Sequence, residues 1–216
     1  MPAAVRALDK ADLDSWLDGY MPYALNTGGI PGAVVVVVKD GQILSARGFG
    51  FADAEKRIAV DPERTLFRPG SVSKLVTWTA VMQLVEQNKL NLDADINQYL
   101  DFKIAPLDGA PVTLRQLMTH TAGFEEAAKD IIDYSPAPAP KLGALLKAWV
   151  PTRIYAPGTT PAYSNYATAL AGYIIERVSG QSFDDYVERH VFTPLGMASA
   201  SFRQPLPPAP APESNR

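Results

Sequence analysis

Five consecutive valines at positions 34–38 constrain the fold of this 216-residue chain more than any other feature. Valine is branched at Cβ and packs well on the pleated surface of a β-strand. The run is followed by Asp40-Gly41, and an Asp-Gly pair between two apolar segments is typical of a tight hairpin turn. We therefore predict a β-hairpin over residues 33–53. Because no polar residue interrupts the valines, we expect their strand to be covered on both faces.

Helical periodicity flanks this hairpin on both sides. Before it, apolar side chains recur at three- and four-residue steps over about 9–25, which predicts an amphipathic helix (Leu13, Trp16, Leu17 and Tyr20). After it, the apolar residues from Ser71 onward leave almost no polar face, so we expect that helix to lie at the centre of the molecule. The chain is thus sheet-forming early and helical later, which predicts an α+β fold.

Local signals mark the ends of the later helices. Thr113 is followed three residues later by Gln116, which is a capping-box pattern at a helix start. Gly180 ends a periodic apolar segment and is expected to close that helix in the left-handed conformation. Ser182 then begins the next helix as its N-cap.

Two proline-rich segments, 135–141 and 205–212, are expected to be extended and poorly helical. We predict that the first is a surface loop. The chain is accordingly divided into an N-terminal helix with early sheet strands (1–68) and a mainly helical lobe (69–200). The remainder, 201–216, is predicted to be a tail or a linker to a missing C-terminal part.

Composition excludes several functional classes. The net charge is −3 with both signs interspersed, and no basic stripe suggests a nucleic-acid partner. The chain has no cysteine, which excludes disulfides and thiol nucleophiles, and its two histidines are too few for a typical zinc site. The longest aliphatic run, 33–38, is too short to cross a bilayer. Residues 1–16 hold no apolar core of signal-peptide length, so the protein is cytoplasmic or its export signal has been removed.

Ser71 and Lys74 form the strongest short chemical motif in the chain. Their three-residue spacing places both side chains on one face of a helix, within reach of each other. A serine at a helix start lies beside free N–H groups and the positive end of the helix dipole, which favour an alkoxide. Burial of Lys74 in an apolar wall would lower its pKa and make it a proton acceptor. The alternative is that Ser71 is an N-cap and Lys74 an exposed first-turn residue.

A second motif, Tyr163-Ser164-Asn165, lies 92 residues after Ser71 on a loop that enters a helix. A tyrosine hydroxyl can relay a proton, and an asparagine amide can orient a lysine or hold a substrate carbonyl. The alternative interpretation is a buried tyrosine followed by a capping asparagine.

Together these stretches resemble the serine hydrolases related to class C β-lactamases, a group that includes D-Ala-D-Ala carboxypeptidases and family VIII esterases. The resemblance covers most of residues 30–200, because whole blocks such as IPGAVVVVVKDGQILSARGFGFAD and VTLRQLMTHTAGF match in order. It implies a β-lactamase/transpeptidase-like fold, in which an antiparallel sheet is flanked by helix and joined to a mainly helical lobe. Of that sheet, this chain supplies the early strands.

The resemblance also implies roles for individual residues. Ser71 corresponds to the acylated nucleophile, Lys74 with the help of Tyr163 to its base, and Asn165 to the residue that contacts the lysine and the substrate. His120, in LMTHTAGF, matches a characteristic residue of the family, and its role is expected to be structural.

One part of the family pattern is missing. The family carries a Lys-Thr-Gly or His-x-Gly motif on a late strand, and no such motif follows Tyr163 here. We therefore expect the chain to be the N-terminal piece of a longer polypeptide. Loss of one oxyanion-hole donor typically costs about 10²–10³ in rate.

These observations predict an acyl-serine hydrolase, or the N-terminal fragment of one, that acts on a small ester, amide or β-lactam without metal or cofactor. The alternative is a catalytically inactive scaffold of the penicillin-recognising type. The early strands leave an apolar edge, so a complementary C-terminal fragment or a second copy of the chain is an expected partner. Relatives of this kind usually work in the periplasm or outside the cell, and we expect the same location here.

Overall fold

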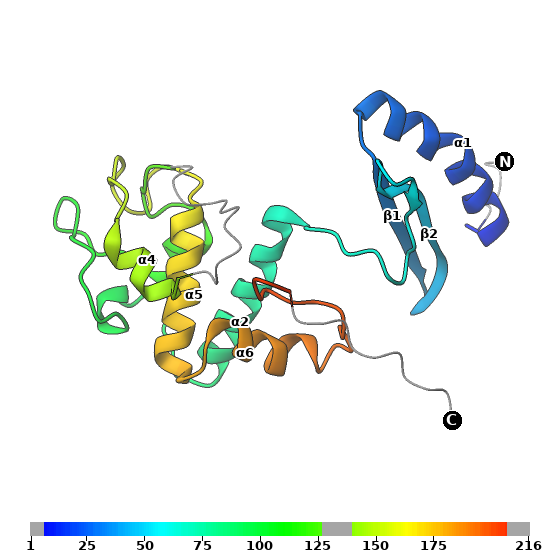
Figure 1. Ribbon diagram of the computed structural model, residues 1–216. Coiled ribbons are helices and arrows are strands. Elements are labelled where there is room, and N and C mark those ends of the chain that lie inside the picture. The colour runs from blue at the N-terminus through cyan, green and yellow to red at the C-terminus, as the bar shows by residue number, and fades with distance from the viewer. Residues whose placement is uncertain (1–6, 127–139, 207–216) are drawn as a thin grey trace, which may run out of the picture. The chain divides into compact units, whose positions relative to one another are not determined.

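The computed structural model describes residues 7–126 and 140–206, which form two compact units, Met1–Arg68 and Pro69–Arg216 (Figure 1). Most of the two proline-rich segments lies outside the described residues, so the predicted loop and tail are not tested. Within the described ranges, no helix is long and apolar enough to cross a membrane.

The first unit contains one helix and a three-stranded antiparallel sheet. Helix α1 spans Lys10–Gly28, and the strands β1 (Gly32–Lys39), β2 (Gln42–Asp53) and β3 (Ile58–Ala59) pair in that order. The predicted hairpin and its Asp40-Gly41 turn are confirmed, since both turn residues have positive φ values of 50° and 75°. The two-residue strand β3 carries too little pattern to be predicted.

Helix α1 packs on β2 through polar as well as apolar contacts. Ser45 Oγ donates to Asp14 at 2.6 Å, and Arg47 donates to Asp18 at 2.5 Å. The expected apolar face is only partly correct: Leu17 is buried, whereas Trp16 and Tyr20 stack on each other at the surface. Two aromatic side chains four residues apart can stack on the exposed side of a helix, so their spacing alone does not distinguish an exposed pair from a buried one.

The expectation that the valine strand is covered on both faces is wrong for the described chain. Val36 and Val38 are 50% and 60% exposed. The physical reason is that, within the described part of this unit, α1 is the only helix and covers one face of the sheet.

The second unit is a helical lobe with one large core. A 3₁₀ turn, Gly70–Ser73, leads into α2 (Lys74–Glu86). The lobe then adds a 3₁₀ turn (Ile96–Gln98), α3 (Leu114–Met118), α4 (Leu142–Ala148), α5 (Asn165–Ser179), α6 (Phe183–Val187) and a π-helical turn (Glu188–Phe192). Its largest fully buried side chains include Leu84, Ile96, Leu114, Leu117, Phe124, Leu170, Ile174 and Ile175.

Helix α5, and not α2, lies at the centre of this lobe. It contacts α2, α3, α4 and α6, and seven of its residues from Ala167 to Ile175 are buried (Figure 1). The prediction that α2 is central is therefore corrected: Val81 and Leu84 are buried, but Leu75 is 66% and Met82 44% exposed. Both helices are rich in apolar residues, and only the packing decides which one is enclosed.

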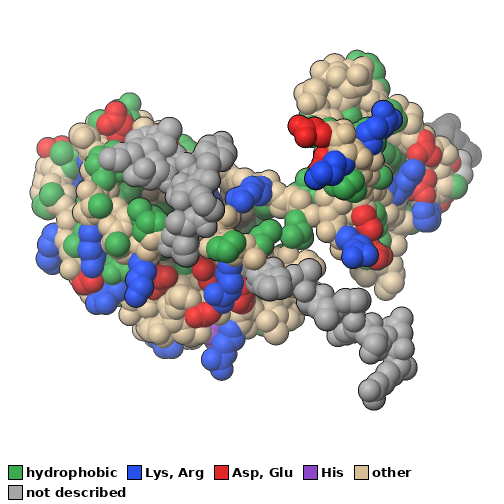
Figure 2. All heavy atoms as spheres, in the orientation of Figure 1, with side chains coloured by type: hydrophobic (Ala, Val, Ile, Leu, Met, Phe, Trp, Pro, Cys, Tyr) green, Lys and Arg blue, Asp and Glu red, His purple; other side chains and the backbone are tan. Residues whose placement is uncertain are grey.

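The predicted helix ends are confirmed. Thr113 and Gln116 make both bonds of the capping box, Gly180 closes α5 with φ 71°, and Ser182 accepts from the backbone N–H of Asp185 to cap α6. Acidic and basic side chains are interspersed over the face drawn in Figure 2, in agreement with the absence of a basic stripe in the sequence.

Candidate active site

Ser71 and Lys74 lie at the head of α2, as predicted. The Ser71 hydroxyl accepts a hydrogen bond from Lys74 Nζ at 3.0 Å. Ser71 lies in the 3₁₀ turn rather than in the α-helix itself, and Ser73 occupies the N-cap position without a side-chain capping bond. Ser71 is therefore the serine that faces the lysine.

The Tyr163-Ser164-Asn165 motif enters the site from the start of α5. Ser164 is buried and caps the helix by accepting from the backbone N–H of Ala167 at 3.1 Å. Asn165 is the first residue of α5, and Tyr163 precedes the cap. The capping bond of buried Ser164 therefore fixes where α5 begins, and with it the positions of Tyr163 and Asn165 on either side.

All four predicted residues come together in the helical lobe. Tyr163 Oη lies 2.5 Å from Ser71 Oγ, and Lys74 Nζ donates to Asn165 Oδ1 at 2.7 Å. The Lys74 amine also lies 4.7 Å from the centre of the Tyr163 ring. One serine hydroxyl thus has a phenol and an amine within hydrogen-bond reach.

The site is open and polar. Hydrogen bonds to Lys74 and then to Ser71 lower the pKa of the Tyr163 phenol, although its side chain is 45% exposed. Lys74 is half-buried, and its bonding partners are a hydroxyl and an amide oxygen.

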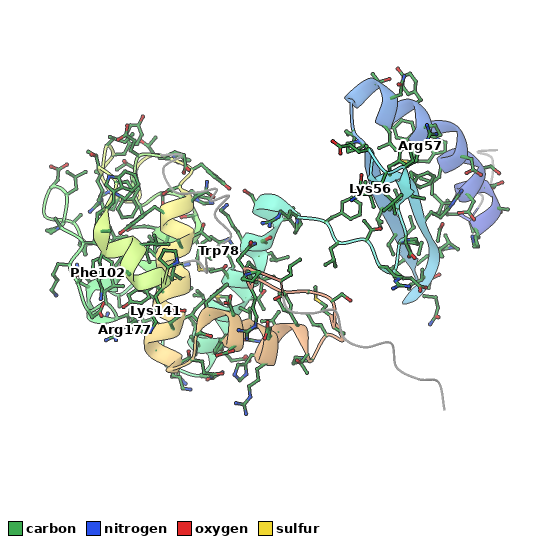
Figure 3. All side chains as sticks on the ribbon, in the orientation of Figure 1. Lys56, Arg57, Trp78, Phe102, Lys141 and Arg177 are labelled. Atoms are coloured by element: carbon green, nitrogen blue, oxygen red, sulfur yellow. The ribbon has the colours of Figure 1, made fainter. Side chains whose placement is uncertain are left out.

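His120 supports Tyr163 from behind. Its imidazole ring stacks on the tyrosine ring with 4.4 Å between centroids, and its Nδ1 accepts from the Ser164 backbone N–H at 3.2 Å. Trp78, labelled on α2 in Figure 3, meets the same imidazole edge-on. Burial and then the charge of Lys74 lower the pKa of His120, which favours the neutral ring that this hydrogen bond needs.

A ladder of backbone hydrogen bonds joins the two segments that hold His120 and Tyr163. Ala162 donates to the carbonyl of His120 at 2.7 Å, and Ile154 donates to that of Gly123 at 2.8 Å. Glu125 donates in turn to Thr152 at 2.8 Å. The segment after α3 and the segment before α5 are therefore fastened together along their length.

Glu126 is the functional candidate that the sequence did not reveal. Its carboxylate accepts from both the backbone N–H and the side-chain Nδ2 of Asn165, at 2.8 and 2.9 Å. The two residues are 39 positions apart, so no periodic pattern connects them. Its place just after the LMTHTAGF block is the one signal that could have marked it.

The described residues contain no group of three or more metal-ligating side chains that could hold a metal ion.

Comparison with known proteins adds the wider context. The sequence profile described as Beta-lactamase matches residues 5–216. Protein flp of Staphylococcus aureus (strain N315) is 27% identical over 89% of this chain and 39% of its own length. Esterase EstB of Burkholderia gladioli is 33% identical over 91% of this chain and 53% of its own length.

Solved structures of related proteins are also similar to this chain. The octameric penicillin-binding protein homologue from Pyrococcus abyssi has a TM-score of 0.72 at 29% identity, over 85% of this chain and 43% of that one. A class C beta-lactamase has a TM-score of 0.70 at 29% identity, over 88% and 50%. The chain thus spans about half, or less, of the length of the proteins it matches.

Proposed function

Because the chain belongs to the beta-lactamase family, we propose that it is an acyl-serine hydrolase, or the N-terminal part of one, with Ser71 as its nucleophile. The predicted family resemblance and the α+β, β-lactamase/transpeptidase-like fold are confirmed. The relatives include proteins named as an esterase, a beta-lactamase and a penicillin-binding protein homologue, which supports hydrolase activity.

The observation that carries the proposal is the pair of contacts on Ser71 Oγ. Tyr163 Oη lies at 2.5 Å and Lys74 Nζ at 3.0 Å, so whichever member of this pair is unprotonated is close enough to take the serine proton. The lowered pKa of Tyr163 increases its phenolate fraction, and the Lys74 ammonium would stabilise that phenolate. A serine with two such neighbours has the arrangement expected of an activated nucleophile.

The proposed reaction has two balanced halves. Ser71 Oγ bonds to the substrate carbonyl carbon while its proton passes to the Tyr163–Lys74 pair, and that proton then leaves with the departing alcohol or amine. In the second half, water attacks the acyl-enzyme, the same pair takes a proton from the water, and Ser71 recovers a proton as its ester bond breaks. Asn165, which holds Lys74, is proposed to contact the substrate as well.

The substrate class is proposed to be a small ester or a D-amino-acid peptide in preference to a β-lactam. The similarity to a protein named Esterase EstB supports an ester as the substrate. Hydrolysis of p-nitrophenyl acetate, D-alanine p-nitroanilide and nitrocefin by the same preparation would rank the three classes.

Covalent labelling tests the nucleophile directly. The 216-residue chain is exposed to a fluorophosphonate probe, and its intact mass is compared with those of Ser71→Ala and Ser73→Ala. We expect one adduct on the wild-type chain and on Ser73→Ala, and none on Ser71→Ala. The Ser73 variant is a matched control, because it removes an identical hydroxyl two residues away.

An adduct that persists in Ser71→Ala would contradict the assignment of the nucleophile. A folded wild-type chain that forms no adduct would favour the alternative function, a penicillin-recognising-type protein that binds without turnover.

A further inference from the structure

The amide of Asn165 can point in two ways, and its neighbours decide which. An asparagine side chain has an acceptor, Oδ1, and a donor, Nδ2, of nearly the same shape. The Lys74 ammonium can only donate, and its Nζ lies 2.7 Å from Oδ1. The orientation that serves the lysine therefore needs a partner that accepts from Nδ2.

Glu126 is that partner. Its Oε1 accepts from Asn165 Nδ2 at 2.9 Å, while its Oε2 accepts from the Asn165 backbone N–H at 2.8 Å. That N–H belongs to the first turn of α5, where no carbonyl of the helix itself can pair with it. A carboxylate has no donor, so the reversed amide would place two acceptors against each other.

We propose that Glu126 is a positioning residue that locks the Asn165 amide so that Oδ1 holds the Lys74 amine against Ser71. The importance of this lock for catalysis rests on the proposed function. The chain of contacts runs from Glu126 through Asn165 to Lys74 and Ser71, and each link is a hydrogen bond of 3.0 Å or less.

Replacement of the carboxylate by an amide tests the lock. Glu126→Gln keeps the size of the side chain but can accept only one of the two Asn165 donors, so the Asn165 amide is free to reverse. Glu125→Gln is the matched control, because it makes the same change of charge one residue away. Circular dichroism on all variants checks that the fold is retained.

The first readout does not depend on activity. The side-chain amide of Asn165, assigned in a ¹H–¹⁵N spectrum from the signal lost in Asn165→Asp, reports its bond to the carboxylate. We expect this signal to move in Glu126→Gln and to stay in place in Glu125→Gln. An unchanged signal in Glu126→Gln would overturn the proposal, whether or not Ser71 is reactive.

The second readout is the rate of fluorophosphonate labelling of Ser71. A misplaced Lys74 amine should slow labelling about 10- to 100-fold in Glu126→Gln, whereas Glu125→Gln should label at the wild-type rate. Equal rates in the two variants would overturn the positioning role while leaving Ser71 as the nucleophile. A wild-type chain that does not label would instead contradict the proposed function, and the amide signal alone would then decide the lock.

A double variant separates orientation from general damage. In Glu126→Gln with Asn165→Asp, the new amide can accept from the backbone N–H and donate to one oxygen of the new carboxylate. The other oxygen then faces Lys74 again. We expect the double variant to label faster than either single variant, a coupling that independent structural defects would not produce.

Discussion

At the scale of single residues, position and not chemical type separates Ser71 from Ser73. The two serines are two residues apart, yet the 3₁₀ turn directs Ser71 to Lys74 and Tyr163, while Ser73 takes the N-cap position of α2. The three-residue spacing of Ser71 and Lys74 predicted their contact correctly. The catalytic roles of the four site residues stay predictions.

Lys74→Ala should slow fluorophosphonate labelling of Ser71 by about 10²–10⁴-fold, because it removes the amine that stabilises proton transfer from the serine. The fold should be retained, since Lys74 is half-buried and bonds within the site. Lys103→Ala, at an exposed position, removes the same charge and should label at the wild-type rate. An unchanged labelling rate in Lys74→Ala would contradict its assignment to the base.

His120 should make stability depend on pH in the acidic range. Burial and the charge of Lys74 lower its pKa from the ordinary value near 6.5, so the unfolded chain binds a proton more readily than the folded one. Its contribution to stability is then complete above pH 6.5 and falls as the pH drops from 6.5 towards the folded pKa.

A ¹H NMR titration should place the midpoint of the His120 ring below 6.5. The urea midpoint of the wild-type chain should also fall more than that of His120→Gln across this interval. A titration midpoint of the His120 ring at or above 6.5 would contradict a stacked, neutral imidazole in the folded chain.

At the scale of elements, the ladder between the two loops decides where Tyr163 lies. Gly123 belongs to this ladder, with φ 83°, and a Cβ atom there would lie 1.9 Å from the carbonyl oxygen of Tyr155. Both its conformation and its surroundings therefore require glycine. The capping box and the cap residues act within one turn, whereas this ladder joins loops that are distant in the sequence.

Gly123→Ala should destabilise the helical lobe by at least about 2–3 kcal/mol, because a side chain adds backbone displacement to left-handed strain. Gly109→Ala is the matched control. Gly109 has φ 75° and open space where a Cβ atom would lie, so the change should cost only about 1 kcal/mol. Chemical unfolding of the two variants measures the difference, and equal losses would show that the close approach to Tyr155 does not matter.

At the scale of the whole molecule, strand β1 forms a long unpaired edge of the sheet in the first unit, among the described residues. Strand β1 pairs with β2 alone, and its eight residues present exposed valines, whereas on the opposite side the two-residue strand β3 pairs only with the end of β2. Long apolar edges promote pairing with another chain, and short ones do not. We propose that a complementary fragment or a second copy pairs with β1.

Native mass spectrometry of the 216-residue chain should therefore show a dimer, a higher assembly or a copurifying chain. Val36→Lys, on β1, should shift the population to the monomer because a charged side chain opposes strand pairing. Ile58→Lys, on β3, carries the same change of charge and should assemble like the wild type. A wild-type chain that is monomeric at all concentrations would contradict strand pairing.

The features that could be predicted from the sequence are those whose interactions are local. The Asp40-Gly41 hairpin turn, the Thr113 capping box and the reach of Lys74 to Ser71 involve residues within a few positions of each other, so spacing and residue type are sufficient. The family resemblance also predicted that the distant residues Tyr163 and Asn165 belong to the site, because whole blocks of sequence matched in order.

Tertiary structure alone decided which apolar surfaces are covered and which distant polar groups meet. The enclosure of α5 instead of α2 and the exposed valines of β1 depend on what packs against each face, and the sequence of one element does not contain that information. The contact of Glu126 with Asn165 depends in the same way on the ladder that aligns two loops. The sequence by itself therefore determined most of the elements and the reactive groups, and packing determined their neighbours.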